Sequence, residues 1–151
     1  MEREPCLDDL PALLDRTRGS GVDARLAVTG AAEVPRSVQV AVYRVVQESL
    51  TNVRKHAGEV RAEVKIVAEG SEIVARVRNP PGDRLGRTDR RPVAGRDAST
   101  PTPAVGAGLV GMRERVALFG GRLDAGQTTE GGFEVCARIP LSTAVLSPGA
   151  A

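Results

Sequence analysis

Apolar residues recur at helical spacing in three stretches of the chain. The strongest signal begins at Val34-Pro35 and runs to about His56, where one face is almost entirely apolar. The members of this stripe are Val38, Val42, Val45, Val46, Ser49 and Val53. Pro35 suits the first turn of such a helix, and Gly58 stops it. The stretches Leu7 to Leu14 and Gly108 to Phe119 predict two further helices.

Apolar and polar residues alternate in five shorter segments, as they do in half-buried strands. The segments span residues 22–28, 62–67, 73–78, 122–125 and 133–139. Gly70 predicts a hairpin between the second and third segments, and Glu130-Gly131-Gly132 predicts another between the last two. After the first short helix, the order is strand, helix, hairpin, loop, helix, hairpin. We therefore expect an α/β fold, a two-layer sandwich whose mixed, mostly antiparallel sheet carries helices on one face. The order disfavours a Rossmann fold.

The regular patterns stop in residues 80–105 and at both ends of the chain. Proline, glycine and arginine dominate residues 80–105, and a loop of this length is typically a functional lid or a disordered segment. Small residues and proline after Pro140 predict a disordered tail over 142–151. The leucine stretch begins abruptly, so we expect residues 1–21 to end a connection from a missing domain. Residues 22–141 then form one domain.

Composition argues against several classes of function. Only 2% of the residues are aromatic, which disfavours nucleic-acid modules that stack bases on aromatic side chains. The formal net charge of +2 gives no electrostatic footprint for DNA or a membrane surface. Two cysteines and one histidine argue against a disulfide framework and against a zinc site. With no signal peptide and no bilayer-length apolar run, we expect a cytoplasmic domain, either free or part of a membrane-anchored protein.

Four polar residues gather at one border of the apolar stripe of the long helix. Glu48 and Asn52 are four residues apart, and Lys55 and His56 follow one turn later. An amide oxygen is a hard ligand of the kind Mg²⁺ prefers, a carboxylate can orient a proton or a water, and an ammonium neutralises phosphate. The same residues also fit a solvated helix face, with His56 favoured at the helix C-terminus. The pattern by itself leaves both interpretations open.

Glycines mark the junction between the long loop and the last helix. The run from Gly106 to Met112 has glycine at 106, 108 and 111. Glycine there lets backbone N–H groups at a helix N-terminus approach an anion closely. Glycines also simply end loops, but the position of this run between a loop and a helix favours a phosphate cradle.

Both runs resemble motifs of one family. Residues 47–57 (QESLTNVRKHA) closely resemble the N box of sensor histidine kinases, and residues 106–116 (GAGLVGMRERV) resemble their second glycine box, in the form found in nitrate-sensor-like bacterial kinases. Residues 119–123 and 131–135 are similar to the same subfamily. The boxes stand in the expected order and spacing, and the resemblance covers about residues 7–141. The chain thus resembles the ATP-binding catalytic domain of a two-component sensor kinase, which has the Bergerat (GHKL ATPase) fold.

This resemblance implies a role for each candidate residue. Asn52 would ligate Mg²⁺, Glu48 would be the catalytic polar or basic group near the γ-phosphate, and Lys55 and His56 would contact phosphate. Residues 80–105 would form the ATP lid. The glycines would shape the phosphate cradle and lid hinge, and two apolar residues would pack near the nucleotide. These last residues are Gly106, Gly108, Gly111, Leu109 and Met112.

The resemblance also implies ligands and partners. The ligands are ATP and Mg²⁺. The partners are a separate dimerisation domain with the phosphoacceptor histidine and, downstream, a response regulator, with no direct contact to nucleic acid or membrane. Without that acceptor domain, we expect no autophosphorylation of this chain.

The first glycine box departs from the family pattern Asp-x-Gly-x-Gly. The chain reads Asn79-Pro80-Pro81-Gly82-Asp83, so Asn79 keeps an acceptor for the adenine amino group but lacks the charge. Weak ATP binding, a shifted register that uses Gly82, and lost binding stay open, as does a plain turn role for Asn79. A degenerate ATPase-like docking module is therefore one alternative function. An anti-sigma-factor-type serine kinase of the same fold is another, which the Gly-Met-Arg-Glu-Arg run disfavours.

Overall fold

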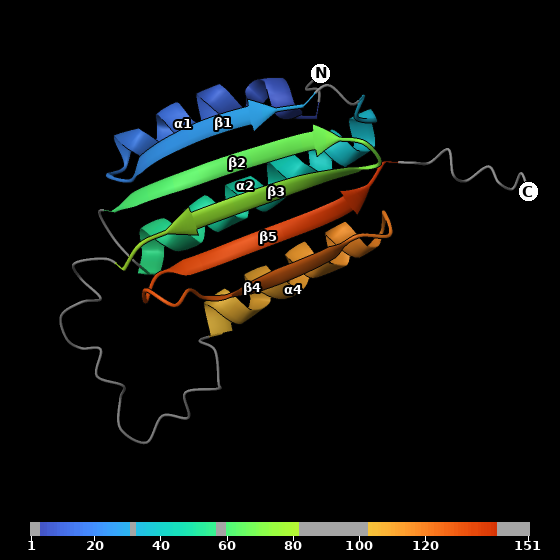
Figure 1. Cartoon of the computed structure of the whole chain (residues 1–151). Coiled ribbons are helices and arrows are strands. Elements are labelled where there is room, and N and C mark those ends of the chain that lie inside the picture. The colour runs from blue at the N-terminus through green and yellow to red at the C-terminus, as the bar shows by residue number, and fades with distance from the viewer. Residues whose placement is uncertain (1–3, 31–32, 57–59, 82–102, 142–151) are drawn as a thin grey trace, which may run out of the picture.

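The chain folds into a two-layer α/β sandwich (Figure 1). A computed structural model describes residues 4–30, 33–56, 60–81 and 103–141. Its elements in chain order are η1 (Leu7–Asp9), α1 (Leu10–Gly19), β1 (Asp23–Thr29), α2 (Arg36–His56), β2 (Arg61–Glu69), β3 (Glu72–Asn79), α4 (Pro103–Ala117), β4 (Arg122–Gln127) and β5 (Phe133–Pro140). The five predicted strands and three predicted helices are all present, with ends that differ by a few residues.

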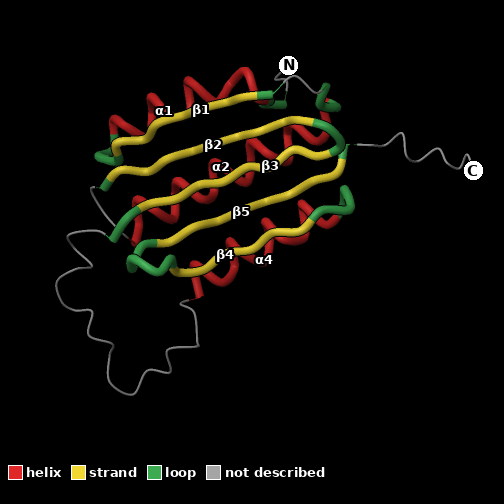
Figure 2. Tube along the Cα trace, in the orientation of Figure 1, coloured by secondary structure: helices red, strands yellow, loops and turns green. Residues whose placement is uncertain are grey.

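The five strands form one sheet in the order β1-β2-β3-β5-β4 (Figure 2). Strand β1 pairs with β2 in parallel, and the pairs β2–β3, β3–β5 and β4–β5 are antiparallel. Figures 1 and 2 show α1, α2 and α4 together behind the sheet. The mixed, mostly antiparallel sheet with helices on one face is therefore confirmed.

The core lies between α2 and the sheet. All six residues of the predicted stripe on α2 are buried, including the polar Ser49. Opposite them, every second residue of the central strands is buried, with Ile66, Ile73 and Ile139 fully enclosed. The other face of the sheet carries exposed cross-strand ion pairs, such as Arg138–Glu72 at 3.2 Å, and such pairs contribute little to stability. Burial on one face alone thus fixes the register of the strands.

Strand β1 is covered along part of its length. Val22 and Ala24 are buried as the alternation predicts, but Leu26 is half-buried and Val28 is 51% exposed. A groove of about 480 Å³, lined in part by Leu7 and Val34, opens beside Val28. The helical layer does not close over this end of the edge strand.

The last helix begins earlier than the sequence predicts. We expected it near Gly108 after a loop over 80–105, but α4 begins at Pro103. Proline is favoured in a first helical turn, and alanine at positions 104 and 107 favours the helix that follows it. Gly106 therefore lies within α4 together with Gly108 and Gly111, not in the loop before the helix. The rest of the predicted lid, 82–102, and the predicted tail, 142–151, lie outside the described residues.

Gly121 provides a test of how tightly α4 and the sheet are joined. A Cβ atom there would collide with the Arg138 carbonyl oxygen and lie 2.9 Å from Val116 Cγ1. Because backbone cannot yield as a side chain can, Gly121→Ala should lower the free energy of unfolding by about 1–3 kcal/mol in urea.

Gly126→Ala is the matched control on β4. A Cβ atom at Gly126 meets nothing within 4 Å, so its stability should stay within about 0.5 kcal/mol of the wild type. Equal stabilities for the two variants would contradict the close packing described around Gly121.

Candidate nucleotide site

Three segments that carry the predicted site residues meet at one end of the sandwich. Figure 1 shows the C-terminal ends of α2 and β3 and the N-terminal end of α4 at this end of the sheet. Helix α2 supplies the N-box residues, α4 the glycine run, and β3 the residue expected to accept a bond from the base. The chain order alone does not bring these segments together, so the fold supports the predicted grouping.

Helix α2 presents Glu48 and Asn52 at the border of its buried face. Both side chains are half-buried, while Lys55 is exposed one turn further on. Among the described residues, none forms a hydrogen bond with the Glu48 carboxylate or the Asn52 carboxamide. His56 ends the helix, and its side chain lies outside the described part of the chain. The α2 side of the site thus offers one carboxylate and one amide, half-shielded from water and available to a ligand.

Helix α4 packs directly on this border of α2. A Cβ atom on Gly108 would lie 2.5 Å from Glu48 Oε2, so glycine is what lets α4 approach the carboxylate. Four residues later, the buried Met112 accepts a hydrogen bond through its sulfur from Ser49 Oγ at 3.7 Å. Leu109 is half-buried and packs against the core. Glu48 is therefore held between two helices whose spacing a glycine sets.

Asn79, at the end of β3, is a buried polar residue whose side-chain NH₂ group forms a hydrogen bond. It is 5% exposed, and Nδ2 donates a hydrogen bond to the Pro80 carbonyl oxygen at 2.8 Å. A carbonyl oxygen can only accept, so this bond fixes which way the amide faces. Oδ1 is left as an acceptor without a hydrogen bond from any described residue. Gly82, the other candidate of this box, lies outside the described residues.

The β4–β5 turn closes against the same strand end. A Cβ atom on Gly132 would collide with the Asn79 carbonyl oxygen and lie 2.8 Å from Pro80 Cα. A Cβ atom on Gly131 would reach Pro81 Cγ at 3.4 Å, and Gly131 has a φ of 95°. The sequence marked these glycines as a turn and as family-like, but it did not predict that they pack on Asn79-Pro80-Pro81.

A cleft between α2 and α4 extends the site toward the start of α2. It encloses about 520 Å³ and is lined by Glu4, Val40, Arg44, Gln47, Glu48, Gly108, Gly111, Met112 and Arg115. Glu48 and the α4 glycines belong to the predicted site, whereas Arg44, Gln47 and Arg115 were not singled out from the sequence. Arg44 lies one helical turn before Glu48, and this spacing could have indicated from the sequence that the two residues share a face of α2.

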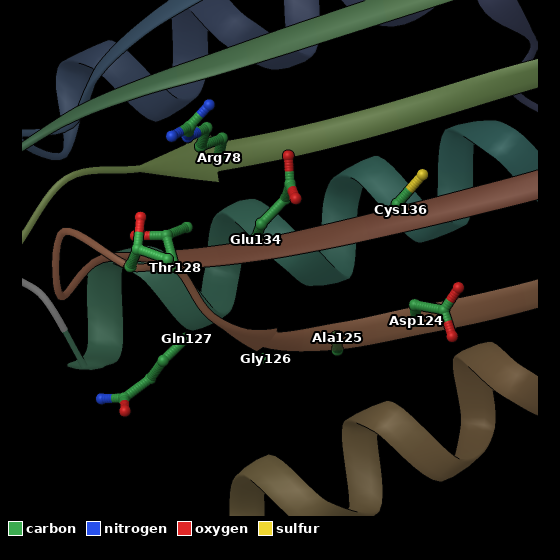
Figure 3. Close-up of a pocket in the computed structure, with 9 residues that line it drawn as sticks. Arg78, Asp124, Ala125, Gly126, Gln127, Thr128, Glu134 and Cys136 are labelled. Atoms are coloured by element: carbon green, nitrogen blue, oxygen red, sulfur yellow. The ribbon is translucent and has the colours of Figure 1, made fainter.

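A second hollow, of about 470 Å³, lies on the opposite face of the sheet (Figure 3). Arg78, Glu134 and Cys136 line it from β3 and β5, and Asp124 lines it from β4. These side chains belong to the outward positions of their strands, away from the helices. None of the predicted site residues lines this hollow, so it is separate from the candidate nucleotide site.

The described residues contain neither a membrane-spanning helix nor a cluster of metal-binding side chains. In the parts of the chain that the structure covers, no helix is both long and apolar enough to span a membrane. Within the same ranges, no group of three or more His, Cys, Asp or Glu side chains is arranged to hold a metal ion.

Comparison with known proteins agrees with the fold and with the family that the sequence resembles. Residues 37–143 match the model of the family described as histidine kinase-, DNA gyrase B-, and HSP90-like ATPase, and the chain belongs to this family. The resemblance to the catalytic domain of sensor histidine kinases is confirmed. The nitrate-sensor subfamily stays a prediction.

Curated relatives are all longer than this chain. Histidine-protein kinase/phosphatase DegS of Brevibacillus brevis is 29% identical over 109 residues, which are 72% of this chain and 25% of DegS. Sensor histidine kinase LnrJ of Bacillus subtilis (strain 168) is 28% identical over 129 residues, which are 85% of this chain and 28% of LnrJ. The chain thus spans about a quarter of the length of these relatives.

Solved structures share the fold at low sequence identity. The blue-light activated histidine kinase of Erythrobacter litoralis EL346 aligns with a TM-score of 0.65 and 19% identity, over 91% of this chain and 46% of that chain. The nucleotide-free catalytic domain of histidine kinase ThkA aligns with a TM-score of 0.61 and 17% identity, over 93% and 97% of the two chains. These alignments confirm the Bergerat-type α/β fold.

Gly108→Ala tests whether α4 sets the position of the Glu48 carboxylate. The added methyl group displaces Oε2, which is the movable end of a side chain, so the fold should tolerate it. Alanine is also the better helix former, by about 1 kcal/mol, so urea unfolding should show unchanged or higher stability. The ¹³C resonance of the Glu48 carboxyl should shift clearly in this variant.

Gly111→Ala is the control on the same helix. A Cβ atom there meets nothing within 4 Å, so the helix gains the same propensity while the Glu48 resonance stays in place. A Glu48 resonance that moves equally in both variants would contradict the contact.

Proposed function

We propose that this chain binds Mg·ATP and, within a longer sensor kinase, transfers the γ-phosphoryl group to a histidine of a separate dimerisation domain. The observation that carries the proposal is the placement of Glu48 and Asn52 on α2 directly beside the glycine-containing α4. Asn79 at the same end of the sheet supports it as an acceptor for the base. A response regulator would then receive the phosphoryl group, and the domain would act in the cytoplasm.

The donor chemistry at Asn52 fits magnesium. Its carboxamide oxygen is a hard ligand, half-buried, and free of hydrogen bonds from described residues. Mg²⁺ usually takes one or two protein ligands and fills its other positions with phosphate oxygens and waters. Bound there, the ion would neutralise charge on the phosphates. Through the ion, Asn52 would fix the position of the triphosphate relative to α2.

Glu48 and the basic residues after Asn52 would complete the phosphate end. The Glu48 carboxylate lies beside Gly108, one turn before Asn52, where it can orient the imidazole of an incoming histidine or accept its proton. The exposed Lys55 would bind phosphate, and His56 is proposed to do the same. Phosphoryl transfer depends mainly on positioning and charge stabilisation, and the glycines 106, 108 and 111 would let the α4 backbone come close to the phosphates.

Asn79 would recognise the adenine base through a hydrogen bond. Its Oδ1 atom can accept a hydrogen bond from the exocyclic amino group of adenine, while the bond from Nδ2 to Pro80 keeps the amide from turning. Guanine has a carbonyl oxygen at the equivalent position. A carbonyl oxygen has no hydrogen to donate, so it cannot form a hydrogen bond with Oδ1. ATP should therefore bind more tightly than GTP.

A degenerate docking module is the second candidate function. The observation that favours it is Pro81, which stands where the family has a glycine and packs near Gly131. Proline lacks an N–H group and adds bulk at the base end of the site. Calorimetric titration with Mg·ATP distinguishes the two candidates, because a docking module would show weak or no binding.

Asn52→Ala tests the proposed metal ligand. Loss of the amide oxygen should weaken Mg·ATP binding at least tenfold in calorimetry, while binding measured in EDTA should change little. Unfolding in urea controls for damage to the fold and should be nearly unaffected, because the side chain is half-buried and forms no hydrogen bond with any described residue. An unchanged Mg·ATP affinity would remove Asn52 from the metal site.

Asn79→Asp tests the amide orientation at the end of β3. Aspartate has no donor for the Pro80 carbonyl oxygen, so a carboxylate oxygen would face it in a buried site. The free energy of unfolding should fall by about 1–3 kcal/mol. Asn52→Asp makes the same chemical change at a half-buried site with no such bond and should cost clearly less. Equal losses would contradict the assigned amide orientation.

A further inference from the structure

Phe133 lies directly opposite Asn79 in the sheet. The two residues pair across the antiparallel ladder of β3 and β5, and directly paired residues carry their side chains on the same face. On β3, Asn79 continues the buried positions Ile73, Ala75 and Val77, so this is the face that the helices cover. An aromatic residue therefore neighbours the amide that is proposed to accept a hydrogen bond from the base.

Phe133 is the least buried of the inward-facing residues of β5. Val135, Ala137 and Ile139 are at most 3% exposed, whereas Phe133 is half-buried, although it also packs against the core. Figure 1 shows that β5 starts at the end of the sandwich where α2 ends and α4 begins. The described residues therefore leave part of Phe133 uncovered at the end of the fold that carries the candidate nucleotide site.

The β4–β5 turn fixes the position of Phe133 relative to Asn79. Thr128 N donates a hydrogen bond to the Gly132 carbonyl oxygen at 2.9 Å, and Gly132 N donates one to Thr128 Oγ1 at 3.0 Å. Gly132 also packs so closely on β3 that a Cβ atom there would collide with the Asn79 carbonyl oxygen. Because Phe133 directly follows Gly132, these contacts hold its backbone in place beside Asn79.

The other aromatic residues of the chain, Tyr43 and Phe119, lie elsewhere. Tyr43 is 4% exposed, and its hydroxyl group accepts a hydrogen bond from Arg16 Nη2 at 3.3 Å, so its ring belongs to the core. Phe119 follows the C-terminal end of α4, at the opposite end of that helix from the site. Phe133 is thus the aromatic side chain that a base bound at Asn79 would meet.

We propose that the ring of Phe133 packs against the adenine base when the amino group of the base is bound to Asn79 Oδ1. The inference rests on the proposed function and adds a binding residue to it. A hydrogen bond from Asn79 distinguishes the groups at the edge of the base, whereas an aromatic ring contacts the π-face that every base has. Phe133 therefore adds affinity for the base, and Asn79 selects adenine.

Phe133→Leu tests this contact in calorimetric titration with Mg·ATP. Leucine keeps an apolar side chain against the core but removes the aromatic ring, so the Kd for Mg·ATP should rise about fivefold. The Kd for Mg·GTP, measured by competition with ATP, should rise by the same factor, because stacking does not depend on the groups at the base edge. The ratio of the two constants should therefore stay at its wild-type value, which a loss of the Asn79 hydrogen bond would change.

Phe119→Leu is the matched control. Phe119 is also half-buried and packs against the same core, but away from the site. Both leucine variants should lose some stability in urea unfolding, because each removes apolar contacts. Phe119→Leu should nevertheless leave the Kd values for Mg·ATP and Mg·GTP unchanged.

The wild-type chain allows the contact to be observed without a substitution at Phe133. In NMR spectra of the Mg·ATP complex, the ring protons of Phe133 should show nuclear Overhauser effects to adenine H2 or H8. The chain has two phenylalanines, so the spectrum of Phe119→Leu assigns the ring signals. This measurement decides the question if Phe133→Leu does not fold.

Each failure has its own signature. An unchanged ATP affinity in Phe133→Leu, or no Overhauser effect in a saturated wild-type complex, would overturn the base contact and leave the proposed function intact. A loss confined to ATP, with GTP unchanged, would also overturn it, because Phe133 would then act through the amide of Asn79. A wild-type chain that binds no Mg·ATP would overturn the proposed function, and the base contact with it.

Discussion

The packing of α2 on the sheet determines the position of Glu48 and Asn52 in the candidate site, and with them the place where α4 packs. Its valine-rich stripe is buried against the central strands, and this burial fixes the rotation of the helix about its own axis. Glu48 and Asn52 lie at the edge of that stripe, half-shielded from solvent. A rotation by one residue would turn the stripe away from the core by about 100°. The hydrophobic contact therefore orients the polar residues, and α4 then packs against them through Gly108.

Much of this arrangement could be predicted because it depends on local periodicity. The stripe on α2, the five strands and the grouping of Glu48 with Asn52 follow from spacing along the chain. The start of α4 at Pro103 could not be predicted in the same way, because proline and glycine before residue 108 are typical of a loop. Contact with α2 stabilises a helix through this run, and tertiary packing of this kind outweighs the low helix propensity of glycine.

Asn79 shows a different limit of sequence reasoning. The motif comparison treated it as an acceptor that lacks the charge of aspartate. In the fold, the side-chain NH₂ group of Asn79 also donates a hydrogen bond, to the carbonyl oxygen of Pro80. Gly132 then packs against the same backbone, so this strand end is shaped by a turn more than fifty residues away in the chain. No pattern within residues 79–83 indicates either contact.

The order of the strands has a consequence for how the chain reaches this structure. The pairs β2–β3 and β4–β5 are hairpins, which form within microseconds because their partners are close in sequence. The pair β3–β5 joins the two hairpins, and residues 80–132, which include α4 and β4, separate the two strands in the chain. Closing so long a segment is entropically costly, and pairing of this kind slows folding. The junction that places Asn79 against Gly132 is thus also the step that converts two independent hairpins into a single sheet.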